Sequence, residues 1–435
     1  MGANVKCEKQ PAASWFRELL PKYFCKGRLW GSGSPARNRF CRKAPDRTGS
    51  PARDRFCRKA PDRTGSPARD RFCRKAPDRT GTLACQDTYR RFVARKWLVL
   101  LGLAVLLSVS MVLSISVGSS GLSLGEILTA LAGLGTRQSH AIVWNIRMPR
   151  IVTGVVVGCG LALAGCIMQN VLRNPLASAS TLGVSQGASF GAAFAIVCLD
   201  AGAQVNAGAS AAAVSITNPY MVTLCAFVGG FLTTVIILGL SRIARVAPGT
   251  MILAGVALSS LFSGGTTLVQ YFADDVKVAS VVYWTFGDLG RASWKEIGLM
   301  AWITAGALVY FLGNRWNFNA MESGADTARS LGVPVDRLVV VSMTVCALMA
   351  AVATAFVGCI SFIGLVAPHM VRRFVGNDHR FLIPASALTG AVILVLSEVA
   401  SRRIVAPGIL PIGALTSFLG APLFLYMIFK RGNLR

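Results

Sequence analysis

The chain has 435 residues, of which 53% are hydrophobic and only 15% are charged. A composition this apolar and this poor in charge argues against an ordinary soluble domain and favours a membrane protein. The charges are also clustered: residues 1–89 hold 21 Lys or Arg and eight Asp or Glu, whereas the other 346 residues hold only 24 and 11. Two physically different segments therefore share the chain.

The first segment is a basic repeat. The motif RFCRKAPDRTGSPARD recurs every 16 residues from Arg39, in nearly identical copies. Each copy offers one Phe and one Ala-Pro pair among charged residues, too little apolar surface for a solenoid, so residues 1–88 are predicted to be disordered. Attraction to anionic lipid or nucleic acid would be a functional interpretation. We favour a tandem duplication in the DNA, upstream of the true start codon.

The second segment, residues 89–435, contains ten stretches that reach or approach the roughly 20 apolar residues a helix needs to cross a bilayer. These spans are Trp97–Val117, Ile151–Val171, Ala179–Leu199, Tyr220–Leu240, Met251–Tyr271, Ile297–Leu312, Leu338–Val357, Cys359–Val375, Leu382–Ala400 and Ile409–Phe429. The third and eighth are interrupted by Gly, Ser or Pro. The predicted fold is an all-α polytopic membrane protein with about ten transmembrane helices. Because the start of the chain lacks the apolar centre of a signal peptide, insertion is expected to rely on the first span.

The distribution of basic residues predicts the orientation. If the first span enters from the cytoplasm, sixteen Lys or Arg of the second segment fall on the inner side and eight on the outer side. Cytoplasmic loops carry the basic excess, so both termini are predicted to be cytoplasmic. Near the end of the ninth span, Glu398 and Arg402 are one helical turn apart and are expected to form a local ion pair.

Three stretches carry a family resemblance: RMPRIVTGVVVGCGLALAGCIMQNVLRNPLASASTLGVSQGASFG from Arg147, GADTARSLGVPVDR from Gly324, and the region from FIGLVAPHMVRR at Phe362 to LPIGALTSFLGAPLFLYMIFK. In this order and spacing they resemble the FecCD-type permease subunits of ABC importers for iron chelates, haem and vitamin B12. The resemblance covers about Tyr89 to Arg435. It implies a vitamin B12 permease-like fold in the plasma membrane of a prokaryote.

The resemblance also implies partners. These are a second permease, either an identical copy or a close paralogue, two cytosolic ATPase subunits and an extracytoplasmic substrate-binding protein. The phosphate-binding pattern Gly-x-x-x-x-Gly-Lys-Ser/Thr does not occur in the sequence, so ATP and Mg²⁺ are expected to be used by the ATPase. The chain itself is expected to bind membrane lipid, to hold no cofactor or metal, to bind no nucleic acid and to catalyse no reaction.

Four groups of residues are candidates for function by this resemblance. The ATPase-coupling loop lies within residues 314–337, with Glu322, Ser323, Gly324, Ala325, Asp326, Arg329, Leu331, Gly332, Val333 and Pro334 as its candidate residues. The binding-protein docking residues are Arg147, Arg150, Arg402 and Arg403, for which anchoring at helix ends is the alternative. The inner gate is placed at Pro248 and Gly249, where a flexible turn is the alternative. The broken-helix positions are Gly183, Gly364 and Pro368, of which Pro368 is expected to limit its helix.

An inverted internal repeat is indicated by STLGVSQGA and SFIGLVAPH, which begin at Ser180 and Ser361 and each place Gly three residues later. Interrupted helices in such repeats tend to lie near a transport path, although a chance match is the alternative. His369 has no ligand partner at a suitable spacing. We interpret it as a polar contact near the inner end of its span.

Two other classes of function fit the sequence less well. An ion-coupled secondary transporter would need acids or histidines in the middle of its spans, and these are nearly missing. An intramembrane enzyme would need a metal-ligand pair or a nucleophile with its base, and His140, His369 and His379 provide neither. The sequence therefore predicts an importer permease, with a ferric siderophore as the first choice of cargo and haem or a corrinoid as alternatives.

Overall fold

The computed structural model describes residues 79–117, 123–201, 218–244, 248–405, 408 and 410–432, and within these ranges all regular structure is helical. In chain order the elements are α1 (Arg79–Ser116), α2 (Leu124–Leu131), α3 (Arg137–Ile142), the π-helix η1 (Val143–Arg147), α4 (Met148–Val171), α5 (Val184–Cys198), α6 (Pro219–Ala244), α7 (Pro248–Tyr271), α8 (Asp275–Thr285), the 3-10 helix η2 (Leu289–Arg291), α9 (Trp294–Gly313), α10 (Arg315–Glu322), α11 (Ala325–Ser330), α12 (Val335–Val357), α13 (Ile363–Val375), α14 (His379–Arg403) and α15 (Ile412–Gly432).

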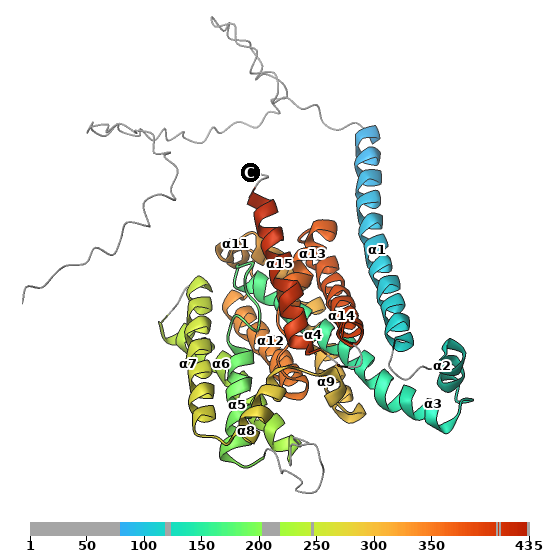
Figure 1. The fold of residues 1–435 in the computed structure, drawn as a ribbon. Coiled ribbons are helices and arrows are strands. Elements are labelled where there is room, and N and C mark those ends of the chain that lie inside the picture. The colour runs from blue at the N-terminus through green and yellow to red at the C-terminus, as the bar shows by residue number, and fades with distance from the viewer. Residues whose placement is uncertain are drawn as a thin grey trace, which may run out of the picture. The chain divides into compact units, whose positions relative to one another are not determined.

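The ten predicted spans each coincide with a helix: α1, α4, α5, α6, α7, α9, α12, α13, α14 and α15 (Figure 1). In the described part of the chain, seven of them are long and apolar enough to cross a membrane, and α5 and α15 carry shorter apolar stretches. The all-α polytopic fold is therefore confirmed, and the chain is a multi-pass membrane protein.

The basic repeat lies outside the described residues except at its end. Residues 79–88, which were assigned to the basic segment, form the first turns of α1. Helix formers such as Leu83, Ala84 and Gln86 occur there, without the prolines of the preceding repeats.

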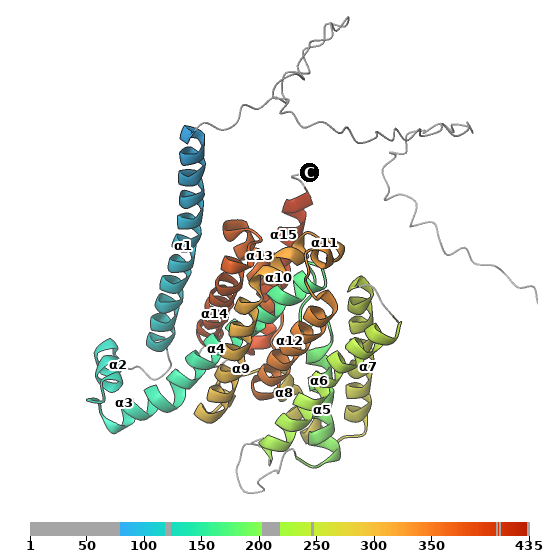
Figure 2. The ribbon, with the colours of Figure 1, turned by 180° about the vertical axis from the view of Figure 1, so that it is seen from behind.

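Helix α4 forms the centre of the bundle, whereas α1 and α7 lie at opposite edges (Figures 1 and 2). In α4 78% of the apolar span is buried, against 11% in both α1 and α7. Glycines allow this packing, because a side chain on Gly158 would clash with the backbone of Gly390 on α14, and one on Gly165 would overlap the carbonyl oxygen of Gly364 on α13. Backbones approach closely where lipid offers no hydrophobic force between helices.

The third and eighth spans are broken, as predicted. By length α5 covers about 22 Å and α13 about 20 Å, less than the roughly 30 Å of hydrocarbon. Each helix begins after a residue in the left-handed conformation, Gly183 with φ 85° and Phe362 with φ 67°. Irregular backbone at membrane depth requires burial in protein, and Ser178 and Ile360 in the two irregular segments are indeed buried.

Pro368 does not limit its helix, contrary to the prediction. Helix α13 continues through it from Ile363 to Val375, and the break lies upstream, between Gly358 and Phe362. Pro368 removes only one donor, which would have bonded to the carbonyl of Gly364. Helix α4 packs closely beside that carbonyl, because a side chain on Gly165 would overlap the carbonyl oxygen of Gly364.

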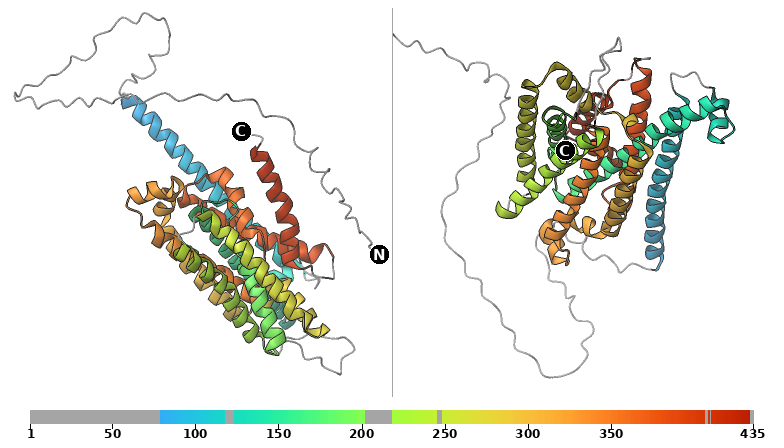
Figure 3. Two further views of the ribbon diagram at one scale, coloured as in Figure 1. Left: turned by 90° about the vertical axis from the view of Figure 1, so that its left-hand side faces the viewer. Right: turned by 90° about the horizontal axis from the view of Figure 1, so that it is seen from below.

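The bundle has two ends, whose helices are labelled in Figures 1 and 2 and seen from two further sides in Figure 3. We call one the α10 end, because it carries α10, α11, the start of α14 and the start of α12. The other, the α3 end, carries α2, α3, α8 and the start of α9. Helix α5 runs toward the α3 end, where the residue Asp200 pairs with Lys277 on α8. Helix α13 runs the opposite way, and Asn377 beyond it hydrogen-bonds to Glu322 of α10.

The two broken spans also meet inside the bundle. The Oγ of Ser189 on α5 lies 3.2 Å from the Sγ of Cys359 in the irregular segment before α13. The opposite directions of the two broken spans fit an inverted repeat, which stays a prediction. The sequence match aligns Gly183 with Gly364, but the left-handed residues are Gly183 and Phe362. The two broken helices therefore correspond as elements, without a residue-by-residue match.

Candidate functional site

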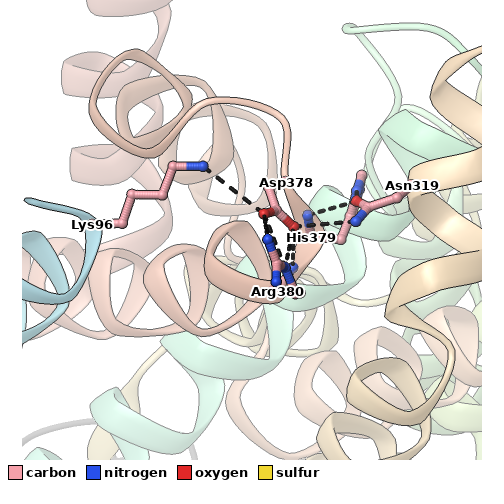
Figure 4. Close-up of polar contacts among 5 residues, drawn as sticks. All are labelled: Lys96, Asn319, Asp378, His379 and Arg380. Carbon is pink, nitrogen blue, oxygen red and sulfur yellow. Dashed lines mark hydrogen bonds and ion pairs between the residues drawn. The ribbon is translucent and has the colours of Figure 1, made fainter. Parts of the chain in front are cut away.

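The short helix α10 is tied to the start of α14 by one asparagine (Figure 4). The Oδ1 of Asn319 accepts from the backbone N–H of His379 at 2.8 Å, and it lies 3.0 Å from the imidazole Nδ1. The Nδ2 of Asn319 donates to the Oδ1 of Asp378 at 3.1 Å. Since Oδ1 can only accept, Nδ1 of His379 carries the proton in this arrangement. All polar atoms of the Asn319 side chain are thus engaged with two consecutive residues.

Asp378 is the centre of this cluster (Figure 4). It caps α14 by accepting from the backbone N–H of Arg380. The guanidinium of Arg380 lies 2.8 Å from Oδ2, and the ammonium of Lys96 on α1 lies 3.9 Å from the same oxygen. Burial raises the pKa of Asp378, but hydrogen bonds from Arg380 and Asn319 outweigh it and lower the pKa to about 2. The carboxylate therefore stays charged and joins α1, α10 and α14.

Glu322, at the end of α10, makes a second connection. The Nδ2 of Asn170, near the end of α4, donates to Oε1 of Glu322 at 3.2 Å and to the carbonyl of Phe318 at 3.1 Å. The Nδ2 of Asn377 donates to Oε2 of Glu322 at 3.3 Å. Helix α10 is therefore held at one side by the end of α4 and at the other by the start of α14.

The rest of the predicted coupling loop forms a turn and the helix α11. Arg329 holds Asp326 at 3.1 Å and Asp336 at 3.0 Å. The hydrogen bond to Asp336 is the main reason that the pKa of Arg329 is raised. Leu331 is 68% exposed beside these charges, and Gly332 follows it with φ 84°. Leu331 directly follows α11, so the exposed leucine and these charges lie together at the α10 end, and ATPase coupling through them stays a prediction.

The candidate loop residues are thus divided between two environments. Gly324 is buried against the guanidinium of Arg173, and Ala325 and Val333 are half-buried. The remaining members are exposed at the α10 end: Glu322, Ser323, Asp326, Arg329, Leu331, Gly332 and Pro334.

At the α3 end, three of the four predicted docking arginines make internal contacts. Arg147 is 3% exposed and donates to the carbonyl of Ile115 on α1. Arg150 and Arg402 flank the buried Glu398 at 3.6 and 3.2 Å, which confirms the expected pair of Glu398 with Arg402.

These arginines also reach neighbouring elements. Arg402 donates to the Oγ of Ser114 and to the carbonyl of Val117, and Arg150 lies 3.8 Å from Asp288. Arg403 is the exposed member of the predicted set. The cluster joins α1, α4 and α14, and docking stays a prediction.

The predicted inner gate lies at the first residues of α7, with Pro248 at the first helical position and Gly249 after it. Proline is well suited to that position because its missing N–H would be unbonded there in any case. Gly249 is exposed at the α10 end. His369, as predicted, makes a polar contact, with its Nε2 2.7 Å from the carbonyl of Pro175.

Sequence reasoning missed the asparagines that hold α10. Asn319 and Asn170 were not selected, and neither was Asp378. A signal for Asn170 exists, because Gln169 and Asn170 are two amide side chains at the end of an otherwise apolar span. Polar residues in such a place need partners, and here Gln169 donates to the carbonyl of Leu365 on α13.

Comparison with known proteins gives a consistent result. The model of the FecCD transport family matches residues 106–430. A protein of Methanocaldococcus jannaschii described as an ABC transporter permease is 47% identical over 79% of this chain and 97% of its own length. The hemin transport system permease of Yersinia pestis is 33% identical over 76% of this chain and 97% of its own. Permeases named for Fe(3+)-citrate and vitamin B12 match at 34 and 35% identity.

A solved structure agrees with these matches. An inward-facing metal-chelate type ABC transporter superposes with a TM-score of 0.66 at 29% identity, covering 76% of this chain and 98% of that one. The family model spans most of the described helices, from α1 to α15. The chain therefore belongs to the FecCD transport family of membrane permeases.

Proposed function

We propose that the chain is the transmembrane subunit of an ATP-binding-cassette importer that moves an iron chelate inward. In this proposal a ferric siderophore is the cargo, a substrate-binding protein delivers it at the α3 end, and two ATPase subunits bind at the α10 end. A second copy of the chain, or a close paralogue, completes the pathway. The observation that carries the proposal is the attachment of α10 to the ends of α4 and α14 in a member of this permease family.

The attachment of α10 to α4 and α14 suggests how a movement of the ATPase would be transmitted to the membrane spans. An ATPase bound over α10 and α11 would displace α10, and Asn319 and Glu322 would pass that displacement to the helices they contact. Helix α4 is the most buried span, and its Gly165 touches the broken span α13. A movement of α4 would therefore reach the irregular segments where the two broken spans meet.

The choice of cargo is supported by the relatives. The neighbouring structure is of metal-chelate type, and two of the named relatives carry hemin or Fe(3+)-citrate. Haem and a corrinoid remain the alternatives, because the vitamin B12 permease is equally similar. In this class the soluble binding protein sets most of the selectivity for the cargo, so the permease residues do not distinguish a siderophore from haem or a corrinoid.

The test is uptake in proteoliposomes that contain the chain, its ATPase and its binding protein. We expect uptake of a labelled ferric siderophore that requires ATP and stops when the Walker lysine of the ATPase is changed to Ala. Haemin and cobalamin are the comparison cargoes. Uptake of cobalamin alone would overturn the cargo, and ATP-independent uptake driven by an ion gradient would overturn the importer itself.

The orientation is tested with a native cysteine. Cys198, at the end of α5 near the α3 end, is exposed. If that end faces outward, a membrane-impermeant maleimide added to intact spheroplasts labels Cys198, and the label disappears in Cys198→Ser. Labelling that requires permeabilised membranes would reverse the proposed orientation.

The docking role is tested by charge reversal. Arg403→Glu at the exposed position is expected to weaken binding of the substrate-binding protein, more at low salt than at high salt, with thermal stability unchanged. Arg150→Glu is expected to weaken docking and also to lower thermal stability, because Arg150 pairs with the buried Glu398. Unchanged affinity at low salt for both variants would refute docking through these residues.

A further inference from the structure

A cavity of about 740 Å³ lies at the α10 end, between the ends of α4, α6, α7 and α12 and beside α11. Four arginines line it: Arg173, Arg242, Arg329 and Arg337. Among the described lining residues the one acid is Asp336, which is already paired with Arg329 at 3.0 Å. Within the described chain the other three arginines form no ion pair. The cavity, here named the arginine cavity, therefore has an uncompensated positive charge.

The depth of the arginine cavity follows from the helices around it. The apolar spans of α4, α6, α7 and α12 end or begin at Val171, Arg242, Gly249 and Val335. Three of these residues line the cavity, and near Gly249 the lining residue is Met251. The ends of apolar spans lie where hydrocarbon gives way to lipid headgroups. The guanidinium groups are thus placed at headgroup level.

The inner part of the cavity is apolar. Val339, Val340 and Val341 continue its lining along α12, about 9 Å beyond Val335 at 1.5 Å per residue. Met251 on α7 faces the same space, and Val341 is 38% exposed on the surface of the bundle. A site with arginines at the mouth and valines along the wall matches a molecule with an anionic head and an acyl chain.

The backbone at Arg173 supports a specific role for that side chain. Arg173 follows α4 with φ 49°, at a helix end where the N–H of Asn174 bonds to the carbonyl of Gln169. Glycine or asparagine is the usual residue in this left-handed position, because a Cβ is unfavourable there. An arginine is found in that conformation at the rim of the cavity.

We propose that the arginine cavity binds the phosphate-bearing headgroup of an anionic phospholipid, with one acyl chain along the valines of α12. Guanidinium groups offer paired hydrogen bonds to phosphate oxygens, and basic pockets between membrane helices are suited to acidic headgroups. The lipid would fill the space beside α11, and its exchange would alter how firmly α11 is held. The inference holds for whichever leaflet meets the α10 end, and it does not depend on the cargo.

The experiment is a titration of the purified full-length chain with phosphatidylglycerol or phosphatidylcholine in detergent, followed by native mass spectrometry. We expect tighter binding of phosphatidylglycerol and a loss of about tenfold or more in its affinity for the double variant Arg173→Gln/Arg337→Gln. The matched control is Arg90→Gln/Arg91→Gln, which removes two exposed charges of α1 at the same end. Equal losses in the two double variants would overturn the site in favour of nonspecific attraction.

A second variant tests the apolar wall without changing charge. Val340→Trp is expected to displace the acyl chain and to weaken phosphatidylglycerol binding while leaving the arginines in place. Inorganic phosphate at millimolar concentration should compete poorly, and full competition would overturn a lipid in favour of a free anion. If Arg173→Gln/Arg337→Gln retains lipid affinity but no longer co-purifies with the ATPase, the cavity is a protein interface and the lipid proposal fails.

Discussion

The backbone N–H of His379 donates to the side-chain oxygen of Asn319 at 2.8 Å, so that one amide joins the short helix α10 to the first turn of the long helix α14. His379 is fully buried, and a donor left there without a partner would be costly. The contact is therefore a stiff connection between a surface helix and a span rather than an incidental surface hydrogen bond.

Replacing Asn319 by Ala should disconnect α10 from α14 without unfolding the bundle. The change removes the hydrogen-bond partner of the buried N–H of His379 and of Asp378. The lost hydrogen bonds should weaken the attachment of α10 to α14 by about 1–3 kcal/mol. We expect ATP-dependent uptake to fall several-fold at unchanged membrane levels. Asn317→Ala is the control, because in the described part of the chain the Nδ2 of Asn317 donates to Asn314, the residue just before α10, and not to α14. Equal uptake by the two variants would remove Asn319 from the coupling path.

The low pKa of Asp378 makes a pH prediction. Its pKa falls from an ordinary 3.8 to about 2 in the folded chain, so the charged form stabilises the native state. That stabilisation is complete above about pH 4 and is lost as pH falls toward 2. In detergent, the melting temperature of the wild type should therefore drop more steeply between pH 4 and 2 than that of Asp378→Asn. Parallel curves would show that Asp378 is not the titrating group.

The charge cluster at the α3 end makes a stability prediction. Glu398 is 1% exposed and lies between Arg150 and Arg402. Glu398→Gln keeps the shape but removes the buried acid that pairs with two half-buried arginines, which should cost about 3 kcal/mol of unfolding free energy. Asp275→Asn, at an exposed position of α8, is the control and should change stability by less than about 0.5 kcal/mol.

A double variant measures the interaction between Glu398 and Arg402 separately from the contacts that each makes with other residues. Glu398→Gln combined with Arg402→Gln should cost less than the sum of the single changes, because the second removes a charge that the first left unpaired. Strict additivity, measured by thermal unfolding in detergent, would mean that the two side chains do not interact.

The sequence predicted the elements better than it predicted the contacts between them. The spans could be found because about 20 apolar residues are needed at each crossing, and the breaks at Gly183 and before Gly364 could be found from interruptions in that pattern. The effect of Pro368 was mispredicted: α13 continues through it, and the break lies before the left-handed residue Phe362. A proline inside a helix removes one hydrogen bond, and the sequence alone does not show whether the helix ends there.

The candidate site shows the same limit. Basic residues near span ends predicted where charges lie, but their partners depend on how distant helices meet. Arg147 contacts the carbonyl of Ile115 in α1, 32 residues away in sequence, and Arg402 contacts that of Val117 just after α1, 285 residues away. Asn319 lies 60 residues before His379. No local pattern specifies such pairs, so a single sequence identifies the polar residues without their roles.

Gly165 offers the sharpest test of the packing. A methyl group there would overlap the carbonyl oxygen of Gly364 and force α4 away from α13. Gly165→Ala should therefore lower the unfolding free energy by about 1–3 kcal/mol or more and reduce uptake. Gly306→Ala on α9 is the matched control, since a methyl group at Gly306 would meet no atom within 4 Å. Both changes add the same helix-favouring methyl group, so any difference in melting temperature reports the contact of α4 with α13. If Gly165→Ala melts at or above the temperature of Gly306→Ala, the two backbones do not touch in the membrane.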